Sequence, residues 1–398
     1  MSFTTASAAS EKVLYSFTND ADGGYPQAGL LLVDGVLYGT TRQGGPHTEG
    51  TAFALTPPAK GKVLWTEKVL HSFGAGVDGS MPYSSLARAS DGVLYGTTPY
   101  GGAHQCGVVY SLTPPSTGAA WTEAVLHSFC ATKTDGSGPV AQVTLNGGGV
   151  YGTTNSGGQA GEGAIFRLTP PAKTGAWTEV ILHSFGGSRA DGVSPFSGLT
   201  AGGGMFVGAT TGDGLYGTGT VYGLTAPANG KTVWTEAAIH NFDGARKDGA
   251  YAYAGLVRTA SGVLYGTTRD GGTHNYGTVY SLTPPAKGKT VWTQTVLHNF
   301  TNAADGGNPY AGLVLDGAGA LYGTTYEGGS QSAGVVFKLI PPAKGKTLWT
   351  ETVLHTFTGN ADGGYPMAGL IRAATGELYG TTLSGGAHNF GTVFQVTP

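Results

Sequence analysis

The sequence has few charges, few cysteines and no long apolar run. Charged residues make up 11% of the 398 residues and the net charge is −3, so no nucleic-acid partner is expected. No apolar stretch reaches the ~20 residues that a membrane-spanning helix requires. Nucleophile elbows, zinc-binding spacings, phosphate loops and paired-carboxylate motifs are also missing. We therefore assign no catalytic residue, and we expect no metal site and no cofactor.

What the sequence has in abundance is glycine, 71 residues, and a repeated unit. The tetrapeptide Tyr-Gly-Thr-Thr marks the unit, and its seventh copy is the degenerate Val207–Thr210. The intact copies are Tyr38–Thr41, Tyr95–Thr98, Tyr151–Thr154, Tyr265–Thr268, Tyr322–Thr325 and Tyr379–Thr382. Successive copies lie 57, 56, 56, 58, 57 and 57 residues apart. A fixed period of this size predicts a solenoid, a propeller or an array, and we treat residues 1–398 as a single domain.

Each unit contains four short segments with strand character. In residues 248–300 these are Ala254–Arg258, Val263–Thr268, Gly277–Leu282 and Trp292–Phe300, which we call strands A to D. They are rich in β-branched and aromatic residues and are bounded by Gly, Pro, Asp or Asn. No segment sustains a helical period, so we expect almost no helix. Seven four-stranded antiparallel units predict an all-β fold, the seven-bladed β-propeller.

The two ends of the chain support a closed ring. The segment at about residues 11–17 matches strand D, and Gly391–Val396 at the other end matches strand C. The first strand can therefore complete the last blade, which removes the exposed edge of a linear array. A linear β-solenoid is the alternative, but it has no reason to begin and end in mid-unit.

Several residue types recur once per unit, and we interpret them as structural. Strand D carries a histidine, with Tyr15 in the first copy, and begins with a tryptophan expected to cover the outer core. The histidines are His71, His127, His183, His240, His298 and His355, and the tryptophans are Trp65, Trp121, Trp177, Trp234, Trp292 and Trp349. A chemical role repeated in every blade is the less favoured alternative for the histidines.

An Asp-Gly pair recurs between strands D and A. The aspartates are Asp22, Asp78, Asp135, Asp191, Asp248, Asp305 and Asp362, and most have Pro four residues later. This pattern predicts an Asx-type turn. A calcium site is the alternative, and it would need several converging oxygens, for which only Asn19–Asp22 is dense enough.

The loops between strands C and D carry a recurring Pro-Pro-Ala-Lys-Gly-Lys sequence. Its lysines are Lys60, Lys62, Lys173, Lys231, Lys287, Lys289, Lys344 and Lys346. We interpret them as a solvated rim that keeps sheet edges soluble, rather than as a binding patch.

The D–A and B–C loops should emerge together on the opposite face, and they carry the residues that vary between units. Aromatic residues form a collar there, with scattered Arg, Asp, Glu and His. Such a collar suits stacking on a sugar or another flat ligand, although unconstrained drift of loop residues would also produce variety. The candidate ligand-binding residues are Tyr25, Gln27, Arg42, His47, Tyr83, His104, Phe196, Tyr251, Tyr253, Arg269, Asp270, His274, Tyr310, Tyr326, Glu327, Tyr365 and His388.

The two cysteines should lie on that same face of one blade. Cys106 ends a B–C loop, and Cys130 follows strand D of the same unit. We predict a disulfide between them, which favours an oxidising compartment. Two buried free thiols are the alternative.

The motif Leu-Tyr-Gly-Thr-Thr…Gly-Gly…Gly-Thr-Val-Tyr…Leu-Thr-Pro-Pro, as in Leu264–Pro285, resembles the GloVer tandem repeat. That repeat is named for Gloeobacter and Verrucomicrobium and belongs to bacterial choice-of-anchor proteins. The resemblance implies a secreted or cell-surface protein with variable anchors, and it implies no catalytic motif. The segment Met1–Thr5 predicts no signal peptide, and no anchor follows the last strand, so a cytoplasmic location stays open.

Three functions fit the sequence. The first is a non-catalytic module that binds carbohydrate through the aromatic mouth, and we expect it to be a monomer. The second is an enzyme at the axial mouth, such as a polysaccharide lyase that draws on His104, His274, Arg42, Arg269 and Tyr253 for proton abstraction and uronate neutralisation. The third is a protein-interaction scaffold, which rests on fold analogy alone.

Overall fold

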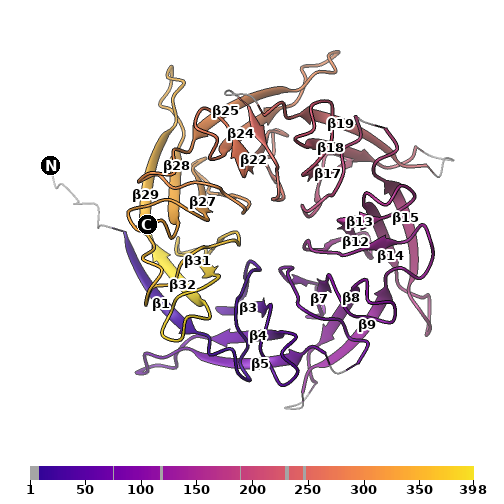
Figure 1. The fold of residues 1–398 in the computed structure, drawn as a ribbon, viewed down its shortest axis with the longest axis vertical. Helices are drawn as coiled ribbons and strands as arrows, with labels where there is room; N and C mark the ends of the chain where they lie inside the picture. Colours follow the sequence, from indigo (N-terminus) through magenta and orange to yellow (C-terminus); the bar gives the residue numbers. More distant parts are fainter. Residues whose placement is uncertain (1–8, 75, 117–119, 189, 229–232, 245–247) are drawn as a thin grey trace.

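The computed structural model describes residues 9–74, 76–116, 120–188, 190–228, 233–244 and 248–398. Seven four-stranded antiparallel sheets surround one axis, as Figure 1 shows. The predicted seven-bladed β-propeller is therefore confirmed, and no helix occurs among the described residues.

The strands of each blade run from the axis outward in the order A, B, C, D. Blade 1 contains β2 (Leu31–Val33), β3 (Val36–Thr41), β4 (Thr51–Thr56) and β5 (Thr66–Ser72); blade 2 contains β6 (Ala87–Arg88), β7 (Leu94–Thr98), β8 (Val108–Thr113) and β9 (Thr122–Ser128); blade 3 contains β11 (Thr144–Asn146), β12 (Gly149–Thr154), β14 (Ala164–Thr169) and β15 (Thr178–Ser184). Blade 4 contains β16 (Thr200–Gly202), β17 (Met205–Thr210), β18 (Thr220–Thr225) and β19 (Thr235–Asn241); blade 5 contains β21 (Val257–Arg258), β22 (Leu264–Thr268), β24 (Thr278–Thr283) and β25 (Thr293–Asn299). Blade 6 contains β26 (Val314–Leu315), β27 (Leu321–Thr325), β28 (Val335–Ile340) and β29 (Thr350–Thr356); blade 7 contains β30 (Ile371–Arg372), β31 (Leu378–Thr382), β32 (Thr392–Thr397) and β1 (Ser10–Ser16).

The first strand of the chain closes the ring. β1 pairs antiparallel with β32, from Ser10 opposite Thr397 to Ser16 opposite Thr392. Leu14 of β1 is buried, and Phe17, directly after it, is fully buried. The prediction that the N-terminal strand completes the last blade is confirmed.

Strand A is shorter than the sequence predicts. The prediction for blade 5 was Ala254–Arg258, whereas β21 covers only Val257–Arg258. The preceding residues lie at the axis, where neighbouring blades nearly touch: a Cβ atom on Gly312 would come within 3.0 Å of the carbonyl oxygen of Gly255. Because these residues line the axial channel and pair with no strand among the described residues, the pairing of strand A with strand B begins only at Val257.

Each residue of the Tyr-Gly-Thr-Thr motif has a packing or hydrogen-bonding role, and several of these roles join neighbouring blades. In blade 2, Tyr95 packs edge-on against Trp177 of blade 3 at 6.3 Å between ring centroids. The hydroxyl of Thr97 donates to the carbonyl oxygen of Ala141, also in blade 3. The hydroxyl of Thr98 bonds the carbonyl oxygen of Tyr100, two residues later. The tryptophans therefore fasten one blade to the next, which extends the predicted role of covering the outer core.

The glycine of the motif makes room for an aromatic ring of strand C. A Cβ atom on Gly323 would lie 2.6 Å from the ring of Phe337. That ring in turn packs against Phe300, the fully buried residue after strand D of the preceding blade. The same interblade aromatic pair occurs at all seven interfaces, with centroids 4.9–5.2 Å apart. The hydrophobic core is thus a ring of contacts between blades.

This packing predicts a large difference between two glycine substitutions in blade 6. Gly323→Ala should lower the free energy of unfolding by about 1–3 kcal/mol, because the added methyl group overpacks the interface. Gly317→Ala is the matched control, since nothing lies within 4 Å of its Cβ position and its φ is not positive. Urea unfolding of both variants measures the difference, and equal midpoints would show that the glycine is not required for packing.

The lysine-bearing C–D hairpins extend outward from the ring (Figure 1). The lysines described there are exposed: Lys60, Lys62, Lys173, Lys287, Lys289, Lys344 and Lys346. Lys231 lies outside the described residues. Their exposure agrees with a solvated rim, and their effect on solubility stays a prediction.

Candidate functional site

The D–A and B–C loops of each blade lie together on one face. In blade 3 they pair as β10 (Gly136–Ser137) and β13 (Ser156–Gly157), and in blade 5 as β20 (Gly249–Ala250) and β23 (Asp270–Gly271). Single bridges such as Gly24 with Gln43 make the equivalent contact in the other blades. This places the candidate residues around one mouth of the axial channel, as the sequence indicates.

One residue from each blade forms a collar at this mouth. The collar residue is always the fifth after the Asp of the D–A loop: Gln27, Tyr83, Val140, Phe196, Tyr253, Tyr310 and Met367. All seven line both the axial channel, about 490 Å³, and a cavity of about 580 Å³ above it. A cavity of this size suits a small organic ligand.

Two positions earlier in the same loop, the backbone is left-handed. Tyr25, Met81, Ser194, Tyr251, Asn308 and Tyr365 have φ between 52° and 58°, and the seventh residue is Gly138. The amide of each donates to a carbonyl oxygen of the preceding blade, for example Tyr251 N to Thr218 O at 2.9 Å. That bond holds an otherwise costly conformation. Tyr25, Tyr251 and Tyr365 consequently support the collar without lining the cavity.

Aromatic rings form a continuous wall over blades 4 to 7. Phe196 contacts Tyr253, and Tyr253 contacts Tyr310, each pair at 5.3 Å between centroids. Tyr326 continues the row, 5.4 Å from Tyr310 and 5.3 Å from Tyr365. Phe196, Tyr253 and Tyr310 are the part of this wall that lines the cavity, and their ring faces can stack on the C–H face of a sugar.

The opposite wall is polar and comes from blades 2 and 3. Its lining residues are Pro99, Tyr100, Gln105, Cys106, Ser137, Gly138, Asn155 and Ser156, together with Tyr83 and Val140 of the collar. Most of these were absent from the sequence-based candidates. The sequence shows that these positions vary, because Tyr100 occupies the position of Gln43 in blade 1 and Asn155 that of Arg269 in blade 5. Only the structure shows that a cavity lies beside them.

The arginines of the mouth lie against tyrosine rings, and one of them is also paired with a carboxylate. Arg269 Nε donates to Asp270 at 3.0 Å, and its guanidinium lies over the rings of Tyr251 and Tyr253 at 5.3 and 5.5 Å. The hydrogen bond to Asp270 raises the pKa of Arg269 above its usual range. Arg42 lies over the ring of Tyr83 at 5.2 Å. Neither arginine lines the cavity.

The remaining candidates lie at the edge of the mouth. His47, His104, His274 and His388 are exposed on the B–C loops and do not line the cavity. Asp270 and Glu327 belong to the pairing of the two loops and are also outside the lining. Of the candidates, the structure brings together Gln27, Tyr83, Phe196, Tyr253 and Tyr310 in the cavity itself.

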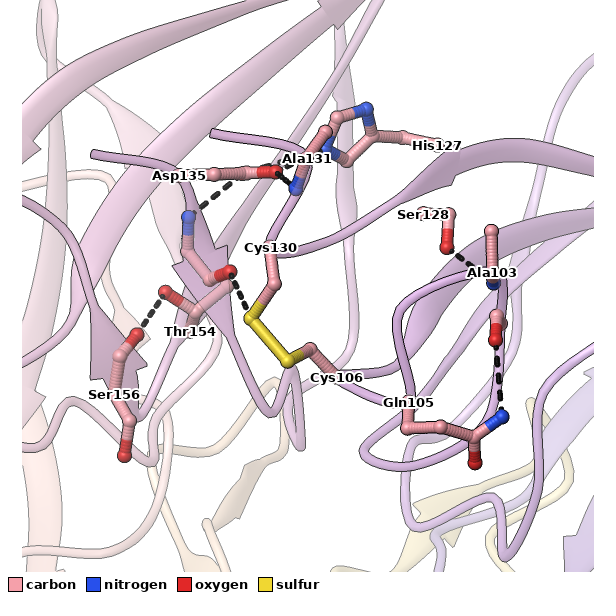
Figure 2. Close-up of a disulfide and its surroundings, with 12 residues drawn as sticks. Ala103, Gln105, Cys106, His127, Ser128, Cys130, Ala131, Asp135, Thr154 and Ser156 are labelled. Carbon is pink, nitrogen blue, oxygen red and sulfur yellow. Dashed lines mark hydrogen bonds and ion pairs between the residues drawn. A yellow bond between two sulfur atoms is a disulfide. The ribbon is translucent and has the colours of Figure 1, made fainter. Parts of the chain in front are cut away.

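The two cysteines are joined in a disulfide at the edge of the polar wall (Figure 2). Their Cα atoms are 5.9 Å apart. The carbonyl oxygen of Cys106 accepts from Gly138 N at 2.9 Å, and Cys130 N donates to Gly136 O at 3.2 Å. The disulfide thus braces the loops that carry Gln105 and Ser137.

Reduction of this disulfide should destabilise the protein moderately. It closes a loop with a sequence separation of 24, and the loop-entropy account gives about 3 kcal/mol for that length. We expect the paired substitution Cys106→Ser/Cys130→Ser to lower the free energy of unfolding by that amount, which urea unfolding detects as a lower midpoint. Reductant added to the wild type should have the same effect and should leave the double variant unchanged. A wild-type midpoint that does not respond to reductant would contradict this.

The aspartates of the D–A loops close turns, but these are not the predicted Asx-type turns. Each carboxylate accepts from a backbone amide four or five residues earlier in the chain, whereas an Asx-type turn uses an amide two residues later. Asp22 accepts hydrogen bonds from Thr18 N at 2.9 Å, from the Thr18 hydroxyl and from Tyr15. Asp78 likewise accepts from Gly74 N and from His71. Five of the six recurring histidines hydrogen-bond these aspartates, as the structural interpretation expects, whereas His298 Nε2 lies 3.3 Å from Asp305 but makes no hydrogen bond within the described residues. At Asn19–Asp22, both carboxylate oxygens of Asp22 accept hydrogen bonds while the buried Oδ1 atom of Asn19 has no partner among the described residues, so the calcium alternative stays untested.

Comparison with known protein families identifies the family to which the chain belongs. The Gloeobacter/Verrucomicrobia repeat matches residues 1–132, 66–246, 115–295 and 202–398. The chain belongs to this repeat family. The resemblance that the Tyr-Gly-Thr-Thr units suggested is confirmed over the whole length, although no curated protein matches the sequence.

Solved structures similar to this repeat protein share its fold at low sequence identity. An ancestral GH74 enzyme matches with a TM-score of 0.57 and 14% identity, covering 94% of this chain and 47% of its own. A putative 6-phosphogluconolactonase from Bacteroides uniformis matches with a TM-score of 0.50 and 15% identity, covering 87% and 88%. The repeat protein thus spans about half the length of the GH74 enzyme. Within the described residues, no helix is long and apolar enough to cross a membrane.

Proposed function

We propose that this protein binds a neutral carbohydrate in the cavity at the mouth of its ring, without chemical turnover. The observation that carries the proposal is the lining of the cavity. Among the described residues that form it there is no Asp, Glu, Lys, Arg or His. An aromatic wall faces side-chain amides and hydroxyls of Gln27, Gln105, Asn155 and Ser137. Ring faces that stack and amides that hydrogen-bond hydroxyls together match a sugar.

Tyr83 and Tyr253 of the collar are suited to donate a hydrogen bond to a ligand and not to act as bases. Burial raises the pKa of Tyr83 and of Tyr253 above the ordinary value for a phenol. Both phenols are therefore protonated at neutral pH. A lyase would need a base and a free arginine near the bound uronate, and the collar supplies neither, so the binding function has more support than the enzyme.

The proposed location is outside the cytoplasm. The disulfide between Cys106 and Cys130 favours an oxidising compartment, in agreement with the secreted or surface-exposed proteins that the resemblance to choice-of-anchor repeats implies. We propose that the protein acts there as a monomer with one axial site.

A glycan array tests the function directly. The purified chain should bind neutral glycans and show little binding to uronate polymers, and mass spectrometry of every bound glycan should detect no cleavage product. Preferential binding of uronates, or release of an unsaturated product, would favour the lyase. Absence of all glycan binding would favour a protein partner.

A further inference from the structure

A second repeated feature lies at the seven blade interfaces, away from the mouth. Each interface joins a residue near the end of one strand D, the Asp of the following loop, and the second residue of the next strand D. The seven clusters are Tyr15–Asp22–Glu67, His71–Asp78–Glu123, His127–Asp135–Glu179, His183–Asp191–Glu236, His240–Asp248–Gln294, His298–Asp305–Glu351 and His355–Asp362–Glu11. Figure 2 shows His127 and Asp135 of one cluster.

The aspartate at the centre of each cluster is an acceptor. Asp191 Oδ1 lies 2.7 Å from His183 Nε2, and Asp191 Oδ2 accepts from Gly187 N at 3.1 Å. In the first cluster the Tyr15 hydroxyl takes the place of the histidine and donates to Asp22 at 3.0 Å. Tyrosine and histidine have in common the ability to donate a hydrogen bond to this carboxylate.

The third member is a glutamate in six clusters and a glutamine in one. Gln294 shows what the position requires: its Nε2 donates to Asp248 Oδ1 across the interface at 3.3 Å. A glutamate can make the same bond only when it is protonated, because an ionised carboxylate has no donor. The Oε1 atoms of Glu11, Glu67, Glu123, Glu179, Glu236 and Glu351 are buried and have no hydrogen-bond partner.

The surroundings of these glutamates favour the protonated form. Burial, together with the charge of Asp305, raises the pKa of Glu351 to about 7. The same two causes act on Glu11 beside Asp362, on Glu67 beside Asp22 and on Glu123 beside Asp78, and each pKa rises to about 7. Glu179 and Glu236 also reach about 7, where burial outweighs the opposing charges of His127 and His183. The other groups facing them are the cluster histidines and Tyr15, Tyr110 and Tyr222. Burial lowers the pKa of His298 and of His355, so these two histidines oppose the effect of the glutamates on stability as the pH changes.

We propose that a shared proton locks six of the seven blade interfaces, with each glutamic acid donating to the aspartate in the loop that follows strand D of the preceding blade. Gln294 makes the same bond at the interface of blades 4 and 5 at every pH, because its amide donates without an added proton. The ring should therefore be held most firmly in a mildly acidic medium and should loosen as the pH rises.

A metal ion is the competing occupant of these clusters. The ligand atoms of His127, Asp135 and Glu179 lie within 4.8 Å of one another, and so do those of His183, Asp191 and Glu236. Two observations favour the proton. Tyr15 and Gln294 occupy equivalent positions although they are poor metal ligands, and the aspartate oxygens already accept hydrogen bonds from backbone amides.

The sign of the pH effect follows from proton linkage. A glutamate in the unfolded chain has a pKa of about 4.3, below its value in the ring. Between these two pKa values the folded state holds the proton and the unfolded state does not, so stability decreases as the pH rises. The stabilisation is complete below about pH 4.5 and is lost as the pH passes about 7.

Two reciprocal substitutions at neighbouring interfaces test the lock. Glu351→Gln fixes the bond between blades 5 and 6, and Gln294→Glu makes the bond between blades 4 and 5 depend on a proton. Unfolding in urea is measured at pH 5.5 and 8.0 for both variants and the wild type, with and without EDTA. Relative to the wild type, Glu351→Gln should reduce the change in the unfolding equilibrium constant between the two pH values, and Gln294→Glu should increase it. Each effect should be about 30-fold, because the unfolding constant changes tenfold for each of the ~1.5 pH units between 5.5 and the folded-state pKa of about 7.

Three results would overturn the proposal. Unchanged pH dependence in both variants would show that no proton is shared at these sites. Equal destabilisation of Glu351→Gln at both pH values would show that Glu351 is ionised and paired with His298. An EDTA-dependent stability that Glu351→Gln abolishes would replace the proton by a metal ion.

Discussion

Removing the chain through Phe17 should abolish the folded monomer. This truncation deletes β1, the outer strand of blade 7, and leaves the whole edge of β32 without a partner. It also removes the buried Leu14 and the fully buried Phe17, which packs against Phe53 at 5.2 Å. Losing two such side chains costs on the order of 5–10 kcal/mol. That loss equals much or all of the stability of a typical protein.

A peptide supplied in trans makes this prediction specific. A synthetic peptide of residues 9–18 should bind the truncated chain and restore its near-ultraviolet circular dichroism. The matched control peptide carries Leu14→Asp and should restore nothing, because it places a charge at the buried position of the strand. Without peptide, the truncated chain should be unfolded or associated through its open edge. A truncated monomer with the melting temperature of the wild type would contradict closure of the ring by β1.

Substitution of Tyr253 by alanine should nearly eliminate glycan binding. Tyr253 contacts Phe196 and Tyr310 and so lies at the middle of the aromatic wall. Central aromatic residues of an interface contribute at least ~2 kcal/mol, which corresponds to a loss of affinity of about 30-fold. Calorimetric titration with the best neutral glycan measures the change.

Two further variants separate the site from the rest of the surface. Tyr253→Phe keeps the ring and loses only the hydroxyl, so it should retain most of the affinity if stacking dominates. Tyr216→Ala removes an exposed tyrosine of a B–C loop outside the cavity, 59% exposed, and should leave affinity unchanged. Equal losses in Tyr253→Ala and Tyr216→Ala would place the binding surface elsewhere.

The fold was predictable because the same residue types occupy the same packing positions in every blade. The period of the Tyr-Gly-Thr-Thr motif indicates the number of blades, and the half-blades at the two ends indicate closure. The partner of each histidine was not predictable from spacing alone. His71 and Asp78 are brought together by the turn between them, whereas Glu123 reaches Asp78 only because blade 2 packs against blade 1.

The aromatic half of the site was predictable and the polar half was not. The collar position follows the Asp-Gly turn at a fixed distance, so Tyr83, Phe196, Tyr253 and Tyr310 could be recognised in sequence. The left-handed backbone at Tyr25 and Tyr251 could not be anticipated, since bulky side chains disfavour it. In this conformation, Tyr25 and Tyr251 stay outside the lining of the cavity. The cavity beside Tyr100 and Asn155 depends on the sizes of side chains from several blades of the closed ring. The sequence of a single repeat does not contain that information.

The most direct test of the central claim is a crystal structure of the protein with its tightest neutral glycan. We expect electron density for one sugar ring in the mouth cavity, stacked on the wall of Phe196, Tyr253 and Tyr310. Its hydroxyl groups should lie within hydrogen-bonding distance of Gln27, Gln105 or Asn155. Density on the outer rim among the lysine hairpins, with an empty mouth, would contradict the account.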